Sequence, residues 1–231
     1  MRNIHRKFCA IQLIVSVAVI LFIPTSLYAG MEENSQKEIE KYIDTFQRPF
    51  RMTQHTTAES LAYAGRSDPQ IFDLIEKQLL DNYKSLDDPY DVDWASWLAK
   101  ALGFSGNNKY SETLALLQRD APDRKLRKYA KIGANLTHKY NRWNAIMVDT
   151  ENYDDQLSLA QNRYANMLRS EVPELQVLAA KRIFFEGIRI DKMTKLVQYR
   201  IDHPSPKADR GTSKWLKKSL CTDCKTFGSR P

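Results

Sequence analysis

Apolar residues recur every three or four positions along most of the chain, and Gly, Pro, Asn or Asp stands where one apolar run ends and the next begins. Positions three and four apart share one side of an α-helix, so this spacing is typical of amphipathic helices. No segment alternates apolar and polar residues over the length that a half-buried strand requires. We therefore predict an all-α protein.

Start and stop signals divide this pattern into separate helices. Residues 32–46 read as a first helix, and residues 47–57 are expected to form a loop because Pro49 and a pair of threonines interrupt the pattern. Asp68 followed by Pro69 is typical of an N-cap and the first position of a helix. Further apolar stripes predict helices within 58–65, 69–79, 94–102, 110–121, 123–140, 141–150, 157–168, 173–183 and 191–200.

Two turns in this series resemble each other. "AGRSDP" (64–69) and "LGFSGN" (102–107) share a Gly, a Ser and a tight turn, and Gly103 minus Gly65 gives a spacing of 38 residues. That spacing lies in the range of stacked helical hairpins. Each hairpin leaves an apolar side exposed unless a neighbour covers it, so we expect pairs of helices stacked in sequence order.

The stretch "WLAKALGFSGNNKYSETLALL" (97–117), followed by "DRKLRKYAKIGANL" (123–136), resembles HEAT-type, armadillo-like helical repeats. The resemblance covers about Ala58 to Tyr140 and extends with less similarity to Tyr199. It implies an α-solenoid of stacked hairpins over residues 56–203, after an N-terminal helix and loop over 30–55. Residues 131–133 lack the usual "ALG" and turn, and the loop after Trp143 is unusually polar, so irregular units are expected there.

The first 29 residues have the layout of a secretory signal. The basic, acid-free start "MRNIHRKF" precedes the apolar run "CAIQLIVSVAVILFI", a Pro and the small-residue stretch "SLYAG". We predict cleavage after Ala29 and therefore an exported protein, periplasmic or secreted. The alternative is an uncleaved N-terminal anchor, because residues 9–27 approach the roughly 20 residues that span a bilayer.

Charge is concentrated at the two ends of the chain. The net charge is +7, and the acid-free residues 1–29 contribute +3 of it, which leaves +4 for the mature chain. Residues 204–231 carry seven basic and two acidic residues, or +5, so residues 30–203 carry −1. A nucleic-acid-binding domain carries its basic residues on the folded part. We therefore expect no nucleic-acid partner.

"CTDC" (Cys221 to Cys224) is the one short motif in the sequence whose side chains could carry out chemistry. In an oxidising compartment these two cysteines are expected to pair as a disulfide. Metal binding, interchain pairing and redox activity remain alternatives. Thioredoxin-type reactivity needs the first Cys at a helix N-terminus in a βα context, and structural zinc needs four ligands. We expect neither a metal nor a cofactor.

Two basic segments are candidate binding surfaces. "DRKLRKYAKIG" places basic side chains near a helix start, as an anion-attracting ridge or simply a solvated face. In the basic C-terminal tail (204–231), Trp215 among lysines could make a weak contact with a membrane surface or a partner. A flexible polar tail is the alternative. The candidate binding residues are Arg124, Lys125, Lys128, Lys131 and Trp215.

No nucleophile elbow, phosphate loop or metal-ligand spacing occurs in the sequence. Asp91 with Asp93, and Asp154 with Asp155, place carboxylates close together, but each pair reads as helix N-capping. Trp94, Trp97 and Trp143 are expected to be core or groove residues.

These observations lead to one functional prediction. We expect an exported scaffold without catalytic activity, whose second helices present polar and aromatic residues to a protein or peptide partner. Two alternatives stay open. One is an enzyme related to the lyases that contain such helical repeats. It would need a catalytic acid or base, and the sequence pattern points to no residue for that role. The other is a membrane-tethered accessory factor, if the signal is not cut.

Overall fold

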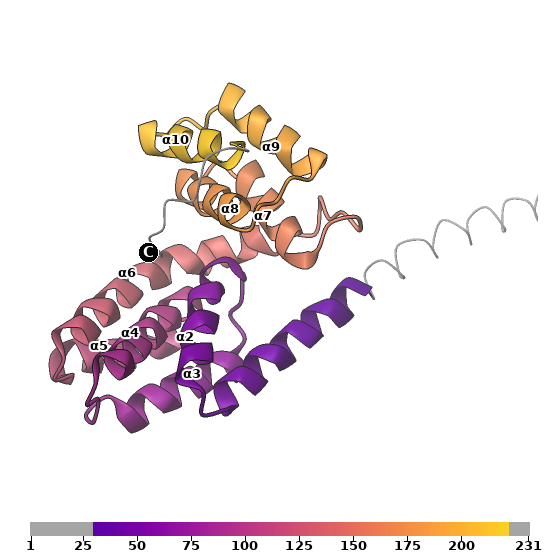
Figure 1. The fold of residues 1–231 in the computed structure, drawn as a ribbon. Helices are drawn as coiled ribbons and strands as arrows, with labels where there is room; N and C mark the ends of the chain where they lie inside the picture. Colours follow the sequence, from indigo (N-terminus) through magenta and orange to yellow (C-terminus); the bar gives the residue numbers. More distant parts are fainter. Residues whose placement is uncertain (1–29, 222–231) are drawn as a thin grey trace, which may run out of the picture. The chain divides into compact units, whose positions relative to one another are not determined.

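The computed structural model describes residues 30–221, which are helices and their connections without a strand (Figure 1). The prediction of an all-α protein is confirmed for this part of the chain. The predicted signal peptide, its cleavage site after Ala29, and Cys224 lie outside the described residues. Within residues 30–221 no helix is long and apolar enough to span a bilayer.

The chain divides into two compact units, Met1–Lys41 and Tyr42–Pro231. A helix over residues 30–47 begins in the first unit and ends in the second. The helices of the second unit are α2 (Arg51–Ser60) with the 3-10 turn η1 (Leu61–Tyr63), α3 (Pro69–Asn82), α4 (Pro89–Phe104), the 3-10 turn η2 (Asn108–Tyr110), α5 (Ser111–Asp120), α6 (Arg124–Met147), α7 (Leu159–Arg169), α8 (Pro173–Phe185), α9 (Asp191–Asp202) and α10 (Arg210–Ser219).

Most helix starts carry the local signals that the sequence offers. Pro opens α3, α4 and α8, where its missing N–H costs no intrahelical hydrogen bond. The carboxylates of Asp88 and Asp123 each accept two backbone N–H groups from the first turns of α4 and α6. Asp68 stands at the N-cap of α3 as predicted, but its side chain makes no capping hydrogen bond. Asp191 is the first residue of α9, and Ile190 stands at its N-cap.

The loop predicted over residues 47–57 is mostly helical, because α2 begins at Arg51. A tertiary contact explains this start. Gln54 is buried, its amide donates to the carbonyl of Arg48 at 2.6 Å, and its Oε1 accepts the indole N–H of Trp94 at 2.7 Å. Since Trp94 is 40 residues away, no local sequence pattern could show this contact.

One further helix prediction is wrong. Residues 124–147 form the single helix α6, with no break between 140 and 141, because no Gly or Pro interrupts its buried stripe there. In the region predicted as a basic tail, where a flexible chain was one interpretation, residues 210–219 form α10. This helix packs on α8 and α9, buries Leu216, and is capped by Asp209.

Each helix of the second unit packs mainly on helices one or two places away in the chain. α4 packs on α2, α3 and α6, and α6 packs on α4, α5 and α7. α8 and α9 both pack on α7 and on α10. Figure 1 shows α2, α4, α5 and α6 side by side, and α8, α9 and α10 following α7. When the helices are paired in chain order as α2 with α3, α4 with α5, α6 with α7 and α8 with α9, the first helices α2, α4 and α6 pack one on the next. An ion pair from Lys139 to Glu174 (3.2 Å) joins α6 to α8.

α4 and α6 touch backbone to backbone. A Cβ atom added to Gly103 would lie 2.2 Å from the carbonyl oxygen of Gly133, and one added to Gly133 would lie 2.6 Å from the carbonyl oxygen of Ala99. Gly103 therefore serves helix packing, not a turn. Among the described residues, the counterpart of Gly65 in the next pair is Gly106, since both adopt a left-handed conformation, with φ of 63° and 64°.

Candidate binding face on α2, α4 and α6

Three partly exposed rings form a row across three neighbouring helices. His55 of α2 meets Trp97 of α4 edge to face, with ring centroids 5.7 Å apart, and Trp97 meets Tyr129 of α6 in the same way at 5.8 Å. We call these three residues the ring row. Edge-to-face contacts suit the charge distribution of aromatic rings, so the row is held in one arrangement.

The sequence explains why α4 supplies the centre of this face. Positions 93, 97, 100 and 104 are three or four apart and therefore lie on one side of the helix. Most other positions of α4 are buried against its neighbours. Beyond the first turn of α4, the side chains that are not buried are Asp93, Trp97 and Lys100.

Lys100 lies directly beside the ring row. Its Nζ is 4.2 Å from the centroid of the Trp97 ring, 5.7 Å from that of Phe104 and 6.0 Å from that of Tyr129. Burial lowers the pKa of Lys100 below its usual range, the nearby carboxylate of Glu59 opposes this shift, and the charge of Lys181 adds to it. An ammonium over ring faces is attracted by the ring quadrupole, which holds the side chain in place.

Ion pairs border the ring row at the starts of α4 and α6. Asp91 pairs with Arg51, and Asp93 pairs with Lys125 and lies 3.5 Å from the Nε2 of His55. The prediction that these two aspartates cap a helix is wrong, because Asp88 caps α4. With the cap supplied by Asp88, both carboxylates reach across to neighbouring helices.

A second aromatic cluster follows on α8 and α10. The predicted binding residue Trp215 is half-buried, with Lys181 and Lys218 each 4.9 Å from its ring centroid and Phe185 at 6.2 Å. Trp215 also lines a hollow of about 630 Å³ between α8 and α10, with Pro173, Glu174, Val177, Lys207, Asp209, Gly211 and Thr212. The charge of Lys181 in this cluster contributes to the lowered pKa of Lys100.

Arg182 fixes α8 to the preceding helices. Its guanidinium lies 4.3 Å from the ring centroid of Tyr63 and pairs with Glu186, which also accepts the hydroxyl of Tyr164 at 2.9 Å. Burial raises the pKa of Tyr63 to about 12, and the positive charge of Arg182 opposes the shift. This cluster positions α8, and its charges are balanced.

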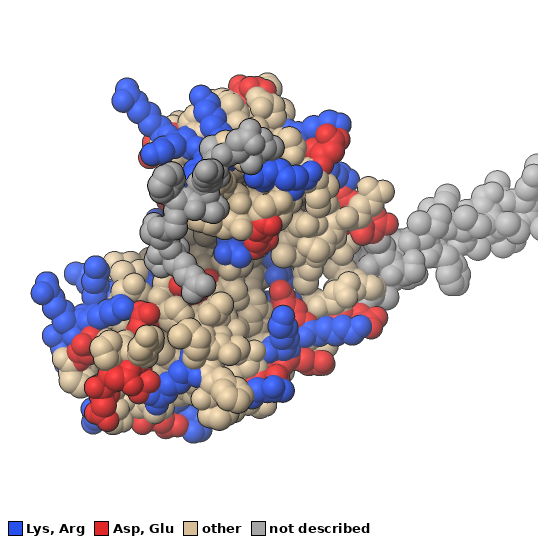
Figure 2. All heavy atoms as spheres, in the orientation of Figure 1, with Lys and Arg blue, Asp and Glu red and all other residues tan. Residues whose placement is uncertain are grey.

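All four residues of the predicted basic ridge on α6 are exposed, and one of them, Lys125, also pairs with Asp93 of α4. Figure 2 shows Lys and Arg side chains gathered at the left edge, over the joined ends of α5 and α6. Of these four residues, Lys125 belongs to the border of the ring row.

Cys221 is disulfide-bonded, while its predicted partner Cys224 lies outside the described residues, so that pairing stays a prediction. Cys221 follows the C-terminus of α10, where Arg189 donates to its carbonyl oxygen at 2.9 Å. The negative end of a helix dipole disfavours a thiolate, whereas thioredoxin-type cysteines stand at helix N-termini. This position favours a structural disulfide.

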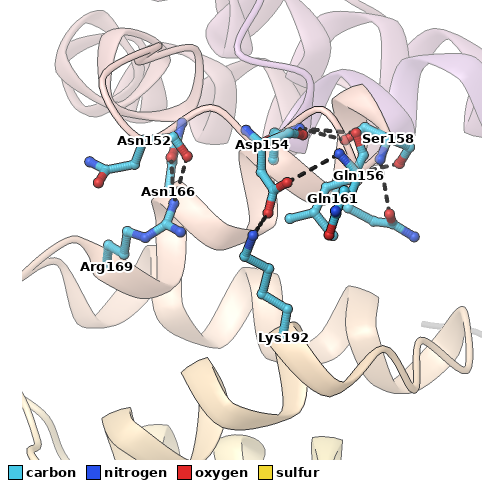
Figure 3. Close-up of polar contacts among 10 residues, drawn as sticks. Asn152, Asp154, Gln156, Ser158, Gln161, Asn166, Arg169 and Lys192 are labelled. Carbon is cyan, nitrogen blue, oxygen red and sulfur yellow. Dashed lines mark hydrogen bonds and ion pairs between the residues drawn. The ribbon is translucent and has the colours of Figure 1, made fainter.

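The polar loop between α6 and α7 is held by side chains of the helices around it (Figure 3). Asp154 pairs with Lys192 of α9, and the amide of Asn166 donates to the carbonyl of Asp149 at 2.7 Å. The prediction that Asp154 caps α7 is wrong, because Ser158 and Gln161 form a capping box there. Asp155 is exposed. The network orders the loop.

Within residues 30–221 no group of three or more His, Cys, Asp or Glu side chains could hold a metal ion. No family model, curated protein or solved structure matches the chain.

Sequence reasoning missed the ring row, although part of its signal was present. The spacing of Asp93, Trp97 and Lys100 could have shown one outward side of α4. The partners His55 and Tyr129 come from other helices, and only the packing of α2 and α6 on α4 brings them to Trp97.

Proposed function

We propose that this chain is an exported helical-repeat scaffold that binds an extended segment of a protein partner. The binding face comprises the ring row, Glu59 and Lys100, and continues through Lys181 to Trp215 and Lys218. The observation that carries the proposal is the convergence of partly exposed rings and cations from three successive first helices on one side.

The residue types suit recognition of a protein. Trp and Tyr are enriched among the residues that dominate interface energies, and their large rigid side chains lose little conformational entropy on binding. The edge-to-face contacts fix the rings before a partner arrives, so less ordering remains to be done on association.

The packing supports a stacked, HEAT-like arrangement as part of the proposal. Neighbouring first helices, α2 with α4, α4 with α6, and α8 with α10, pack directly on one another. Repeat arrays of this kind present one side of each unit to a long ligand. The proposed face lies on the first helix of each pair, such as α2, α4 and α6. From the sequence we expected the second helix of each pair to bind the partner.

Site-specific photocrosslinking in cells tests the proposal. We expect p-benzoylphenylalanine in place of Tyr129 to give a discrete protein adduct, because that ring lies on the binding face. The matched control replaces Tyr199, an exposed tyrosine of α9, and should give no such adduct. When Trp97→Ala is combined with the crosslinker at position 129, the adduct should be lost. No adduct at 129, or the same adduct at both positions, would contradict the proposal.

A further inference from the structure

Most cations around the binding face have a carboxylate partner within the described residues. Arg51 pairs with Asp91, Lys125 with Asp93, and Lys139 with Glu174, and Arg182 pairs with Glu186. These pairs balance their own charge and leave no excess for a ligand.

Three lysines of the face differ from the rest. Among the described residues, Lys100, Lys181 and Lys218 have no carboxylate within ion-pair distance. Each ammonium lies instead over an aromatic ring, Trp97 for Lys100 and Trp215 for the other two, at 4.2 to 4.9 Å from the centroid. The one carboxylate that influences Lys100 is Glu59, which does not reach ion-pair distance.

We propose that the binding face selects an acidic peptide segment, whose Asp or Glu carboxylates pair with Lys100 and Lys181 while its apolar side chains contact Trp97 and Tyr129. This inference rests on the proposed function and adds the chemical class of the partner.

The environment of Lys100 favours a carboxylate. An ammonium partly removed from water and without a counter-charge gains more from an anion than an exposed lysine does, because the local dielectric constant is lower. Charge-assisted hydrogen bonds to carboxylates are also stronger than neutral ones. The rings hold the lysine stems in position, so the partner orders few side chains on binding.

The shape of the site favours a peptide over an anionic bilayer. Lys100 is partly buried between rings, and Trp215 lines a hollow between two helices. A single Asp or Glu side chain can enter such places, whereas a lipid surface meets protruding lysines first. The exposed residues Arg124, Lys128 and Lys131 would be the better membrane contacts, and they lie outside the face.

Selection from a random twelve-residue peptide library displayed on phage, against the full chain, tests this inference. We expect the selected peptides to be enriched in Asp and Glu and to bind more weakly at higher salt. Lys100→Met keeps the stem and removes the charge, so it should weaken binding of the selected peptides about tenfold, the size of a lost charge-assisted hydrogen bond. Lys181→Met should act in the same direction, and circular dichroism should show both variants folded.

Lys131→Met is the matched control, since it removes an exposed lysine of α6 outside the face and should leave binding unchanged. Peptides without acidic enrichment that bind less to Trp97→Ala would overturn the acidic specificity and leave the proposed function standing. Loss of binding in Lys131→Met but not in Lys100→Met would overturn the assignment of the face. Failure to enrich any peptide, or binding only to vesicles of phosphatidylglycerol, would overturn both proposals.

Discussion

At the scale of single residues, Asn144 of α6 joins the ends of two earlier helices. Its buried amide donates to the carbonyls of Arg66 at 3.1 Å, Phe104 at 2.9 Å and Ser105 at 3.1 Å. These carbonyls belong to the two turns that resemble each other in sequence. One side chain thus satisfies acceptors that both turns leave open, which a local pattern cannot show.

We expect Asn144→Ala to lower the free energy of unfolding by about 1 to 3 kcal/mol, because it leaves buried carbonyls with fewer donors. Asn144→Asp should cost more, since a carboxylate would face carbonyl oxygens. Urea denaturation of each variant measures both effects. Asn135→Ala, at an exposed position of the same helix, is the control and should stay within about 0.5 kcal/mol of the parent chain.

Asp73 of α3 is a single residue that makes the free energy of unfolding depend on pH. It accepts Lys109 Nζ at 2.6 Å and the Tyr110 hydroxyl at 2.8 Å, and the hydrogen bond from Lys109 holds the pKa of Asp73 below its usual 3.8. A lowered pKa in the folded state stabilises the protein above pH 3.8, and this contribution is lost as the pH falls from there through the folded value.

The free energies of unfolding of the parent chain and Asp73→Asn, measured by urea denaturation between pH 2.5 and 7, should therefore converge on acidification. The difference near pH 7 should stay below about 1 kcal/mol, because the pair is half-exposed and screened. A difference that grows as the pH falls would contradict the assignment.

At the scale of elements, the crossing of α4 and α6 depends on two glycines that have nothing to do with turns. Gly103 and Gly133 let the two backbones approach until a Cβ atom has no room. From the similarity of residues 64–69 and 102–107 we expected Gly103 in a turn, because Gly is a common helix terminator. The structure places it inside α4, at the closest approach of the two helices.

Gly103→Ala should lower the free energy of unfolding by about 1 to 3 kcal/mol or more, because backbone atoms of α6 cannot give way as a flexible side chain could. Thermal or urea unfolding measures the loss. Gly211→Ala in α10 is the control, since the nearest atom to its Cβ is the carboxylate of Asp209 at 3.2 Å, the end of a side chain that can move. Equal effects of the two substitutions would show that the close approach is not what Gly103 provides.

At the scale of the whole molecule, charge and export are the properties that composition suggests. The described part of the basic C-terminal region forms α10, which packs its apolar side on α8 and turns lysines outward. Folding of this segment does not reduce its charge, so it remains available for anionic partners.

Intact-mass spectrometry of the protein purified from cells tests the predicted signal cleavage and the predicted disulfide. Cleavage after Ala29 should give a chain that starts at Gly30 and lacks Cys9. Alkylation without prior reduction should leave Cys221 and Cys224 unlabelled, because they are expected to form a disulfide. A mass that retains residues 1–29 would favour the membrane-tethered alternative, and two labelled thiols would exclude the disulfide.

The sequence by itself determined that the described part of this protein is helical, and it located most of the helices. The signals that it carries act within a few residues, such as the carboxylate of Asp123 at the start of α6. The sequence analysis misplaced the start of α2, which depends on a long-range contact from Gln54 to Trp94. It also missed α10, which packs on α8 and α9.

Only the tertiary structure decided which residues meet. His55, Trp97 and Tyr129 are separated by more than 30 residues at each step, and their contact depends on how α2, α4 and α6 pack. The same packing paired Lys125 with Asp93 and left Lys100 over a ring without a carboxylate partner among the described residues. Helical periodicity states which side chains share one face of a helix, but the neighbour of that face is set by burial of the whole core.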